Sequence, residues 1–447
     1  MKIEALAQTI FDDILNHGGE VYIVGGTVRD EMMGYCDQHD VDVEVYHLSY
    51  NQLCTILQQY GHVNTFGQSF AIVQLDTLPH YDFALPRQEK KTGHKHQDFE
   101  TFIDPDLPLE KAILRRDLTI NALMYDYQHK KIIDLSGGLE DLHRHIIRCV
   151  DEKRFIEDPL RVLRVARFIA KLQFEVEPQT KALCRQMVEQ HMLDNLSKER
   201  VYQEYSQILM TDMPSLGFQF LKDIGALPPY LQALTTTNQR LDFHPEGDVF
   251  THTMLVIDVA SHVKQKTDQP LWFMWSCLLH DIGKPLVTTE QGHAPLHNEA
   301  GVEVFQTVDF ITSKKARQYI QTMIMYHMHL MNMSRHHARD ISYLRLLKKI
   351  DGKVSMNDLI YISCCDKLGR GKVAQSQYDE FWIFIQDKQQ RLGNQALPAI
   401  IDGHDLIENG FQNKQMFKKI LEEAYDLQLQ GYRKEKILRS LRKYEQG

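Results

Sequence analysis

The sequence has no segment of the kind that crosses or enters a membrane. None of its apolar runs approaches the roughly eighteen uninterrupted residues that a membrane-spanning helix needs. The N-terminus lacks the apolar core of a signal peptide. The seven cysteines are scattered and form no Cys-x-x-Cys pair, which favours reduced thiols. These absences predict a cytoplasmic protein that makes no membrane contact.

The sequence also has no excess of positive charge. It carries 51 lysines and arginines against 60 aspartates and glutamates, a formal net charge of −9 at pH 7. This balance argues against binding of nucleic acid by bulk electrostatic attraction, so any RNA has to be held by local basic patches. At 447 residues the chain is too long for a single hydrophobic core, and we expect several domains.

Two glycines follow an apolar segment near the N-terminus. Residues 21–24 are apolar, Gly25 and Gly26 interrupt the run, and a helical pattern restarts directly after them. A turn of this kind that leads into a helix presents backbone N–H groups to an anion. The pattern therefore predicts a phosphate-binding turn.

A second segment alternates strictly between apolar and acidic residues. Val41, Val43 and Val45 occupy one face of the predicted strand, whereas Asp40 and Asp42 project from the other. The two aspartate Cα atoms would lie roughly 7 Å apart, so both carboxylates could bind one hard divalent cation. Asp-x-Asp alone is also typical of a solvated hairpin, but the turn just upstream favours a site for nucleotidyl transfer.

Strand and helix patterns divide the chain into two parts of different class. Residues 1–17 carry apolar side chains at helical spacing, which predicts an amphipathic helix. From about residue 150 the strand signals fade, and helices broken by prolines remain. The sequence therefore predicts an α/β head domain followed by all-α segments. Strands are expected at 21–24, 41–46, 70–75, 81–85 and 131–135.

Two clusters of arginines follow the predicted phosphate-binding turn. Arg115 and Arg116 are adjacent and could bind a triphosphate through bidentate contacts, although paired surface arginines are common. Arg161, Arg164 and Arg167 recur at every third position of an otherwise apolar helix. A helix stabilised by structural salt bridges is the alternative to a nucleotide-binding helix.

Two acidic residues open this second cluster. Because a buried arginine needs a partner, we expect Glu157, Asp158 or a bound nucleotide to satisfy the three guanidinium groups. Asp158 and Arg161 also complement the pairing edge of cytosine and adenine, where an exocyclic N–H donor lies beside a ring-nitrogen acceptor. Uracil and guanine present the reverse order. The pair therefore predicts acceptance of CTP and ATP without a nucleic-acid template.

Five motifs in this order resemble those of the class II tRNA nucleotidyltransferases. These CCA-adding enzymes share a head domain with bacterial poly(A) polymerases, within the polymerase-β superfamily. The motifs lie at residues 25–30, 40–42, 115–122, 134–138 and 157–164, and residues 196–204 resemble the neck motif that follows. The resemblance implies that Asp40 and Asp42 are the catalytic pair and bind Mg²⁺. It also implies nucleotide contacts by Gly26, Arg29, Arg116, Asp158, Arg161, Arg164 and Arg167.

Two further segments separate the members of this family. CC-adding enzymes lack a flexible loop before the Arg-Arg-Asp motif, whereas residues 85–93 resemble that loop. We expect the polar segment between Pro86 and Phe99 to form it. Poly(A) polymerases carry a strongly basic strand after their first glycine, whereas residues 67–73 resemble the CCA-adding type. Both segments favour the addition of CCA or of A.

A second candidate metal site lies in the C-terminal half. His280 and Asp281 end an apolar helix, His252 lies upstream and Asp366 downstream. This set resembles the metal-dependent HD phosphohydrolases, and its N and O ligands suit a transition metal ion (Ni, Mn or Co) that activates water. The alternative is that His280 and Asp281 only pack in a degenerate domain. Two histidines could extend the site to a second metal: His297 and His327.

The resemblance implies an activity and a division of labour along the chain. The activity is template-independent addition of CCA to tRNA 3′ ends from CTP and ATP, together with HD phosphohydrolase activity on 2′,3′-ended substrates. The alternatives are an A-adding enzyme, a poly(A) polymerase, or an RNA-binding HD phosphohydrolase with a silent head. The implied segments are a catalytic head at 1–148, a nucleotide- and RNA-binding neck and body at 149–240, an HD domain at 241–370 and a tRNA-binding helical tail at 371–447.

Overall fold

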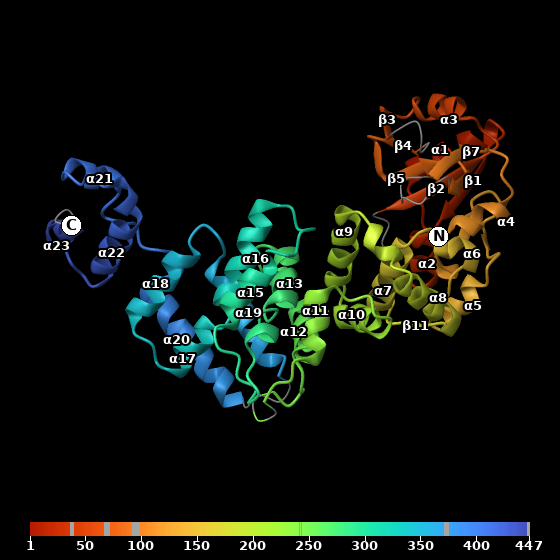
Figure 1. The fold of residues 1–447 in the computed structure, drawn as a ribbon. Helices are drawn as coiled ribbons and strands as arrows, with labels where there is room; N and C mark the ends of the chain where they lie inside the picture. Colours follow the sequence, from red (N-terminus) through yellow and green to blue (C-terminus); the bar gives the residue numbers. More distant parts are fainter. Residues whose placement is uncertain are drawn as a thin grey trace. The chain divides into compact units, whose positions relative to one another are not determined.

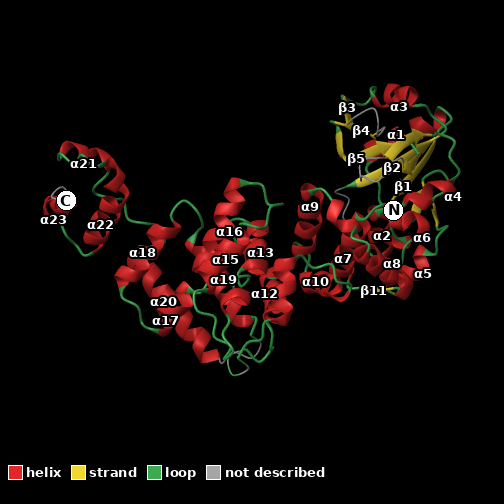
Figure 2. Ribbon diagram, in the orientation of Figure 1, coloured by secondary structure: helices red, strands yellow, loops and turns green. Residues whose placement is uncertain are grey.

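The computed structural model describes residues 1–35, 40–66, 72–91, 99–240, 242, 244–370 and 375–444. The chain forms two compact units, of which the first comprises residues 1–208 and 216–227 and the second residues 209–215 and 228–447. The strands belong to the first unit, and the regular structure described in the second is helical (Figure 2). This confirms the predicted fold class, an α/β head followed by helices. The finer division into four segments stays a prediction.

A seven-stranded mixed sheet forms the centre of the first unit (Figure 1). Neighbouring strands pair antiparallel, except that β2 and β5 run parallel. The five strands expected from the sequence are present, although residues 70 and 71 lie outside the described part. In spatial order the strands are β3 (Val63–Phe66), β4 (Ile72–Leu75), β5 (Leu78–Ala84), β2 (Val41–Tyr46), β1 (Glu20–Val24), β8 (Met124–Asp126) and β9 (Lys131–Ile133).

Several strands were missed in the sequence analysis. Strands β3 and β8 have four and three residues, which is too short for an alternation to be recognised. The prediction of a loop between Pro86 and Phe99 is wrong in part, because β6 (Arg87–Lys91) pairs with β7 (Phe99–Ile103). Backbone hydrogen bonds hold this hairpin, and its polar sequence does not reveal them. Residues 92–98, and residues 67–71 of the segment compared with poly(A) polymerases, lie outside the described residues.

The helices of the first unit cover the sheet and continue beyond it. Helix α1 (Ala5–Asn16) buries Ala7, Ile10, Phe11 and Ile14 on one side, which confirms the predicted amphipathic helix. A two-stranded parallel ribbon joins β10 (Ile146–Ile147) to β11 (Glu175–Val176). The other helices are α2 (Gly26–Met32), α3 (Tyr50–Leu57), α4 (Leu109–Ala112), α5 (Gly138–His143), α6 (Glu152–Glu157), α7 (Leu160–Leu172), α8 (Pro178–Glu189), α9 (Lys198–Leu209) and α10 (Pro214–Asp223).

Helices that are distant in sequence pack together in the second unit. Helix α12 packs against α13 and α19, and α13 also packs against α16 (Figure 1). Near the C-terminus, α21, α22 and α23 enclose a separate apolar cluster that includes Leu406, Ile420 and Ile437. The helices are α11 (Pro229–Gln232), α12 (Val249–Ser261), α13 (Pro270–Leu279), α14 (Lys284–Val287), α15 (His297–Phe305), α16 (Lys314–Tyr326), α17 (His329–Arg335), α18 (Asp340–Ile350), α19 (Met356–Leu368), α20 (Gln375–Leu392), α21 (Gly403–Glu408), α22 (Phe417–Leu429) and α23 (Lys434–Leu441). None of the described helices combines the length and apolarity that a bilayer crossing requires.

Candidate active sites

The glycine turn and the aspartate pair lie next to each other in the head. Gly25 joins β1 to α2 with φ = 76°, a backbone conformation that favours glycine. The antiparallel register pairs Val24 with Asp42, and a Cβ atom on Gly25 would lie 3.4 Å from Asp42 Oδ2. The Thr27 hydroxyl donates to the Asp40 carbonyl over 2.8 Å. The structure therefore brings both aspartates to the start of α2.

A third carboxylate, Asp82, lies beside this pair. The parallel register of β2 and β5 places Asp82 opposite Asp42. Desolvation raises the pKa of Asp42, and the charge of Asp82 raises it further, while Arg116 opposes the shift. Sequence analysis missed Asp82, although it stands between the buried Tyr81 and Phe83 in a predicted strand. Asp42 and Asp82 are like-charged carboxylates on neighbouring strands, with Asp40 just before Asp42, and such a group is suited to a divalent cation.

Glu44 ties the Arg-Arg motif to the same strand. Its buried carboxylate accepts a hydrogen bond from Arg116 Nη2 over 2.6 Å and another from Arg115. Burial alone would raise the pKa of Glu44, but the Arg116 and Arg115 guanidinium groups outweigh it and lower the pKa. Arg116 Nη1 would lie 3.6 Å from a Cβ atom on Gly25. The predicted nucleotide contact at Arg116 therefore lies close to the aspartates.

The partners of the helix-α7 arginines differ from those expected. Arg164 Nε lies 2.6 Å from Asp117 Oδ2, and Arg167 Nε lies 3.0 Å from Glu204 Oε2. Burial favours protonation of Asp117, but Arg164 outweighs this effect and lowers the Asp117 pKa. The sequence pointed to Glu157, Asp158 or a bound nucleotide, whereas the carboxylates that pair with Arg164 and Arg167 come from two other motifs. The arginines therefore connect the Arg-Arg-Asp motif to the neck motif.

Arg29 joins the same cluster from α2. Its Nη1 atom donates to Asn121 Oδ1 over 2.5 Å, and its guanidinium lies 5.1 Å from the Phe168 ring centroid. The guanidinium carbons of Arg164 and Arg167 lie 5.8 and 4.7 Å from that centroid. Three predicted nucleotide-binding residues thus surround one aromatic ring, an arrangement that concentrates positive charge.

The side chains of Asp158 and Arg161 form hydrogen bonds within the protein in this structure. Asp158 Oδ1 accepts from the Leu160 N–H over 3.0 Å, and Asp158 Oδ2 accepts from Arg200 over 3.4 Å. Arg161 donates to the carbonyls of Arg154 and Arg115 over 2.8 and 2.7 Å. Both side chains are therefore fixed, and the base-reading role assigned to them stays a prediction.

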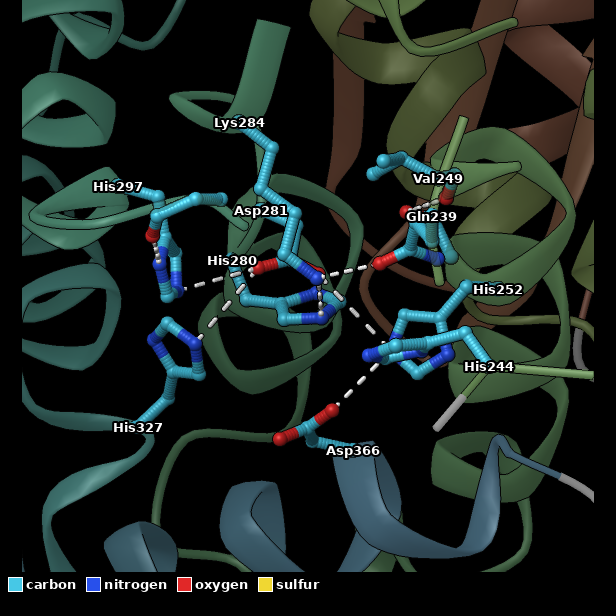
Figure 3. A network of polar contacts seen from close by, with 12 residues as sticks. Gln239, His244, Val249, His252, His280, Asp281, Lys284, His297, His327 and Asp366 are labelled. Atoms are coloured by element: carbon cyan, nitrogen blue, oxygen red, sulfur yellow. Dashed lines mark hydrogen bonds and ion pairs between the residues drawn. The ribbon is translucent and has the colours of Figure 1, made fainter. Parts of the chain in front are cut away.

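The four residues predicted to form the HD site come together in the second unit, with both additional histidines (Figure 3). His252 lies on α12, His280 and Asp281 follow α13, and Asp366 lies on α19. His252 Nε2 is 3.1 Å from Asp366 Oδ1, and His280 Nε2 is 3.1 Å from Asp281 Oδ2. On the other side, Asp281 Oδ1 lies 3.5 Å from His297 Nε2 and 3.8 Å from His327 Nε2.

A glycine allows the second pair of ligands to approach. Gly283 follows Asp281, and a Cβ atom on it would lie 2.1 Å from the His297 carbonyl oxygen and 2.2 Å from the Gly301 nitrogen. Any larger residue would push α15 away. Gly283 therefore allows His297 to lie close to Asp281.

The histidine rings are oriented for metal binding through Nε2. The Nδ1 atoms of His280, His297 and His327 lie 2.8–2.9 Å from the backbone carbonyls of Cys277, Ala294 and Ile324, and donation there leaves each Nε2 lone pair free. Among the described residues, the buried Nε2 atoms of His280 and His297 have no hydrogen-bond partner. Burial lowers the pKa of His327 to about 3, so this ring is neutral, as a ligand must be.

Asp281 lies between two groups of candidate ligands. One group is His252, His280 and Asp281, and the other is Asp281, His297 and His327. Although burial favours the protonated acid, the Lys284 ammonium group, 2.6 Å from Asp281 Oδ2, helps to hold the pKa of Asp281 well below its usual range. The donor set therefore fits one or two divalent ions that share the Asp281 carboxylate.

Glu246 supports this cluster and was missed in the sequence. Its Oε1 atom lies 2.8 Å from His252 Nδ1 and 2.9 Å from His244 Nδ1. Burial opposes ionisation, but the hydrogen bonds from His244 and His252 lower the pKa of Glu246. His252 is thus oriented by a carboxylate, whereas the other three rings contact backbone carbonyls.

Comparisons with known proteins find matches over both parts of the chain that contain these sites. The poly A polymerase head domain family matches residues 21–148, the family described as "Probable RNA and SrmB- binding site of polymerase A" matches residues 173–236, and the HD domain family matches residues 249–367. The multifunctional CCA protein of Xanthomonas campestris pv. campestris (strain B100) is 33% identical over 409 residues, which cover 89% of this chain and 95% of that protein. The multifunctional CCA protein of Paraburkholderia phymatum is 40% identical over 287 residues, which cover 62% of this chain and 65% of that protein.

Solved structures share the fold over nearly the whole chain. An apo form of a CCA-adding enzyme superposes with a TM-score of 0.65 at 19% identity and covers 98% of this chain and 96% of that one. The Thermotoga maritima CCA-adding enzyme complexed with tRNA superposes with a TM-score of 0.59 at 18% identity. That match covers 98% of this chain and 95% of the other. The fold and the matched domains define a nucleotidyltransferase that carries an HD domain. The identity and coverage of the relatives show that the chain belongs to the family of multifunctional CCA proteins.

Proposed function

We propose that the head of this protein adds C, C and A to the 3′ end of tRNA from CTP and ATP and releases pyrophosphate. The observation that carries the proposal is the position of Asp42 and Asp82 on neighbouring strands beside Gly25, with Asp40 directly before strand β2. CCA-adding enzymes of similar fold have been solved in complex with ATP and with CTP, which makes both nucleotides candidate substrates here. The test is extension of a tRNA that lacks its CCA end.

The residues of the head have distinct roles in this proposal. The three aspartates hold Mg²⁺, which neutralises the triphosphate charge when bound. Arg116 contacts the triphosphate from the side of Glu44. The hydrogen bond from Arg116 to the Glu44 carboxylate fixes the position of the guanidinium group. The tRNA 3′ oxygen forms a bond to the α-phosphorus, the bond to the pyrophosphate oxygen breaks, and the 3′ proton passes to the carboxylate cluster.

Replacing Asp158 by alanine tests base selection. If Asp158 and Arg161 read the pairing edge, D158A should incorporate UTP or GTP at a reduced rate, with a loss of discrimination of about tenfold or more. The measurement is single-nucleotide extension with each of the four nucleotides in turn. D151A is the matched control, because Asp151 also caps a helix N-terminus, at α6, but lies outside the proposed edge. Unchanged selectivity of D158A would assign base recognition to other groups.

We propose that the HD cluster holds one or two transition metal ions and hydrolyses phosphate esters at 2′,3′-ended substrates. The supporting observation is the set of buried imidazole nitrogens directed at Asp281. His252, His280, Asp281 and Asp366 would hold the first ion, and His297 and His327 a second, which would supply an activated water. The water oxygen bonds to phosphorus, the ester bond breaks and the sugar oxygen takes the proton.

Glu246 offers a test of the metal site that leaves every ligand in place. E246Q keeps an oxygen acceptor but removes the charge that orients His252, so metal affinity should fall about tenfold, and E246A should lose more. Metal content and titration with Mn²⁺ or Ni²⁺ measure the effect. E303Q is the control, because Glu303 is exposed on α15. Equal metal affinity of E246Q and the wild type would rule out this role for Glu246.

A further inference from the structure

A pocket of about 220 Å³ opens beside the HD cluster and is strongly cationic. Asp281 and Asp366 are the carboxylates among its described lining residues, and both are candidate metal ligands. The cationic side chains that line it are Arg240, Lys284, Arg335, Lys367 and Arg370. With the two carboxylates on metal ions, the walls present net positive charge, which is suited to an anion.

Arg240 pairs with Asp242, and the other four cations divide into two sets. Lys284 Nζ lies 2.6 Å from Asp281 Oδ2, and this cation belongs to the metal site itself. The second set lies where helices α17 and α19 end. Arg335 is the last residue of α17, and Lys367 and Arg370 lie at the end of α19. Arg370 contacts Asp366 at 3.3 Å, whereas Arg335 makes no ion pair within the described residues. The substrate pocket therefore has a cationic end beyond the metal ligands.

Two buried N–H groups of this pocket are unsatisfied within the described part of the chain. The buried Nε atom of Arg370 has no hydrogen-bond partner among the described residues, and neither has Gln239 Nε2, which lines the same pocket. Unsatisfied buried N–H groups cost free energy that a bound anion would recover.

We propose that Arg335, Lys367 and Arg370 bind a second phosphate of the substrate. This proposal rests on the phosphohydrolase function proposed above and names its substrate class. One phosphate reaches the metal ions, while the other lies between α17 and α19. The preferred substrate is then a nucleotide with two phosphate groups, as at an RNA 3′ end, where a phosphodiester precedes the terminal phosphate.

The test compares two substrates that differ only in the second phosphate. The full-length, metal-loaded protein is given a nucleoside 2′,3′-cyclic phosphate with or without a 5′-phosphate. The 5′-phosphate should lower KM about tenfold, since a charge-assisted contact in a partly enclosed pocket is worth about that factor. In R335Q the ratio of the two KM values should fall toward one. R339Q, at an exposed arginine outside the pocket, should keep the wild-type ratio.

Each outcome decides between the proposals. Equal wild-type KM values for the two substrates, or an R335Q ratio equal to that of the wild type, would overturn the second-phosphate site. If neither substrate is hydrolysed, the proposed phosphohydrolase function fails. Equilibrium binding of a nucleoside 3′,5′-bisphosphate to the same protein then tests the subsite alone. Binding weakened by R335Q but not by R339Q supports it, and absent or unaffected binding contradicts it.

Discussion

The variant D42N should lose nucleotide addition almost completely, by about a thousandfold or more, because the transferred phosphate depends on neutralisation by the metal that this carboxylate holds. Asparagine has the size of aspartate but lacks its charge. Incorporation of CTP and ATP into tRNA measures the effect. Both C and A addition should fall together, since one pair of aspartates serves every step.

A carboxylate elsewhere in the same unit provides the control for D42N. Asp194 is exposed and distant in sequence from the cluster, so D194N should add nucleotides at the normal rate. The unfolding temperature of D42N should not fall below that of the wild type, because desolvation and the charge of Asp82 already disfavour the ionised Asp42 carboxylate and Arg116 retains its bond to Glu44. Near-normal incorporation by a folded D42N would end the proposed role of the aspartate pair.

The variant D281N should show the opposite loss. Asp281 is shared by both groups of candidate ligands, so its neutralisation should remove metal from the HD cluster and reduce hydrolysis by about a hundredfold or more. Nucleotide addition should continue, because Asp281 belongs to the second compact unit and the aspartate pair to the first. Metal analysis and parallel assays of the two activities measure both effects.

The controls for D281N separate chemistry from folding. Asp281 is buried against Lys284, and an uncompensated ammonium group there would destabilise the domain. A thermal unfolding curve should therefore accompany the assays. D351N changes an exposed aspartate of the same unit and should retain metal and hydrolysis. Hydrolysis by D281N at the wild-type rate would mean that His280 and Asp281 only pack in the core.

The sequence was sufficient for features that depend on local pattern. The alternation at 41–46 predicts a strand with Asp42 on its exposed face, and the structure has both. The glycine turn is adjacent to that strand because β1 and β2 are neighbours in the sheet. The HD ligands were identified from His252, His280 and Asp366 through a family resemblance, since a helical pattern does not show which distant residues meet.

Features that depend on long-range pairing were not predictable in the same way. Asp82 reaches Asp42 only through the parallel register of two strands that residues 47–77 separate in the chain. Arg167 meets Glu204 across two helices, and the periodicity of α7 reveals a buried arginine but not its partner. Glu246 lies in a segment without regular structure before α12, where no periodic pattern distinguishes it from other loop acids.

Extension of a tRNA that ends at the discriminator base, with CTP, ATP or both, tests the proposed CCA addition most directly. CTP alone should add two C residues, both nucleotides together should complete CCA, and ATP alone should add nothing. Incorporation of A only onto a tRNA that already ends in CC would identify an A-adding enzyme. A long run of A from ATP alone would identify a poly(A) polymerase. Either result, or no incorporation at all by a protein with an active HD domain, would contradict the proposed CCA addition.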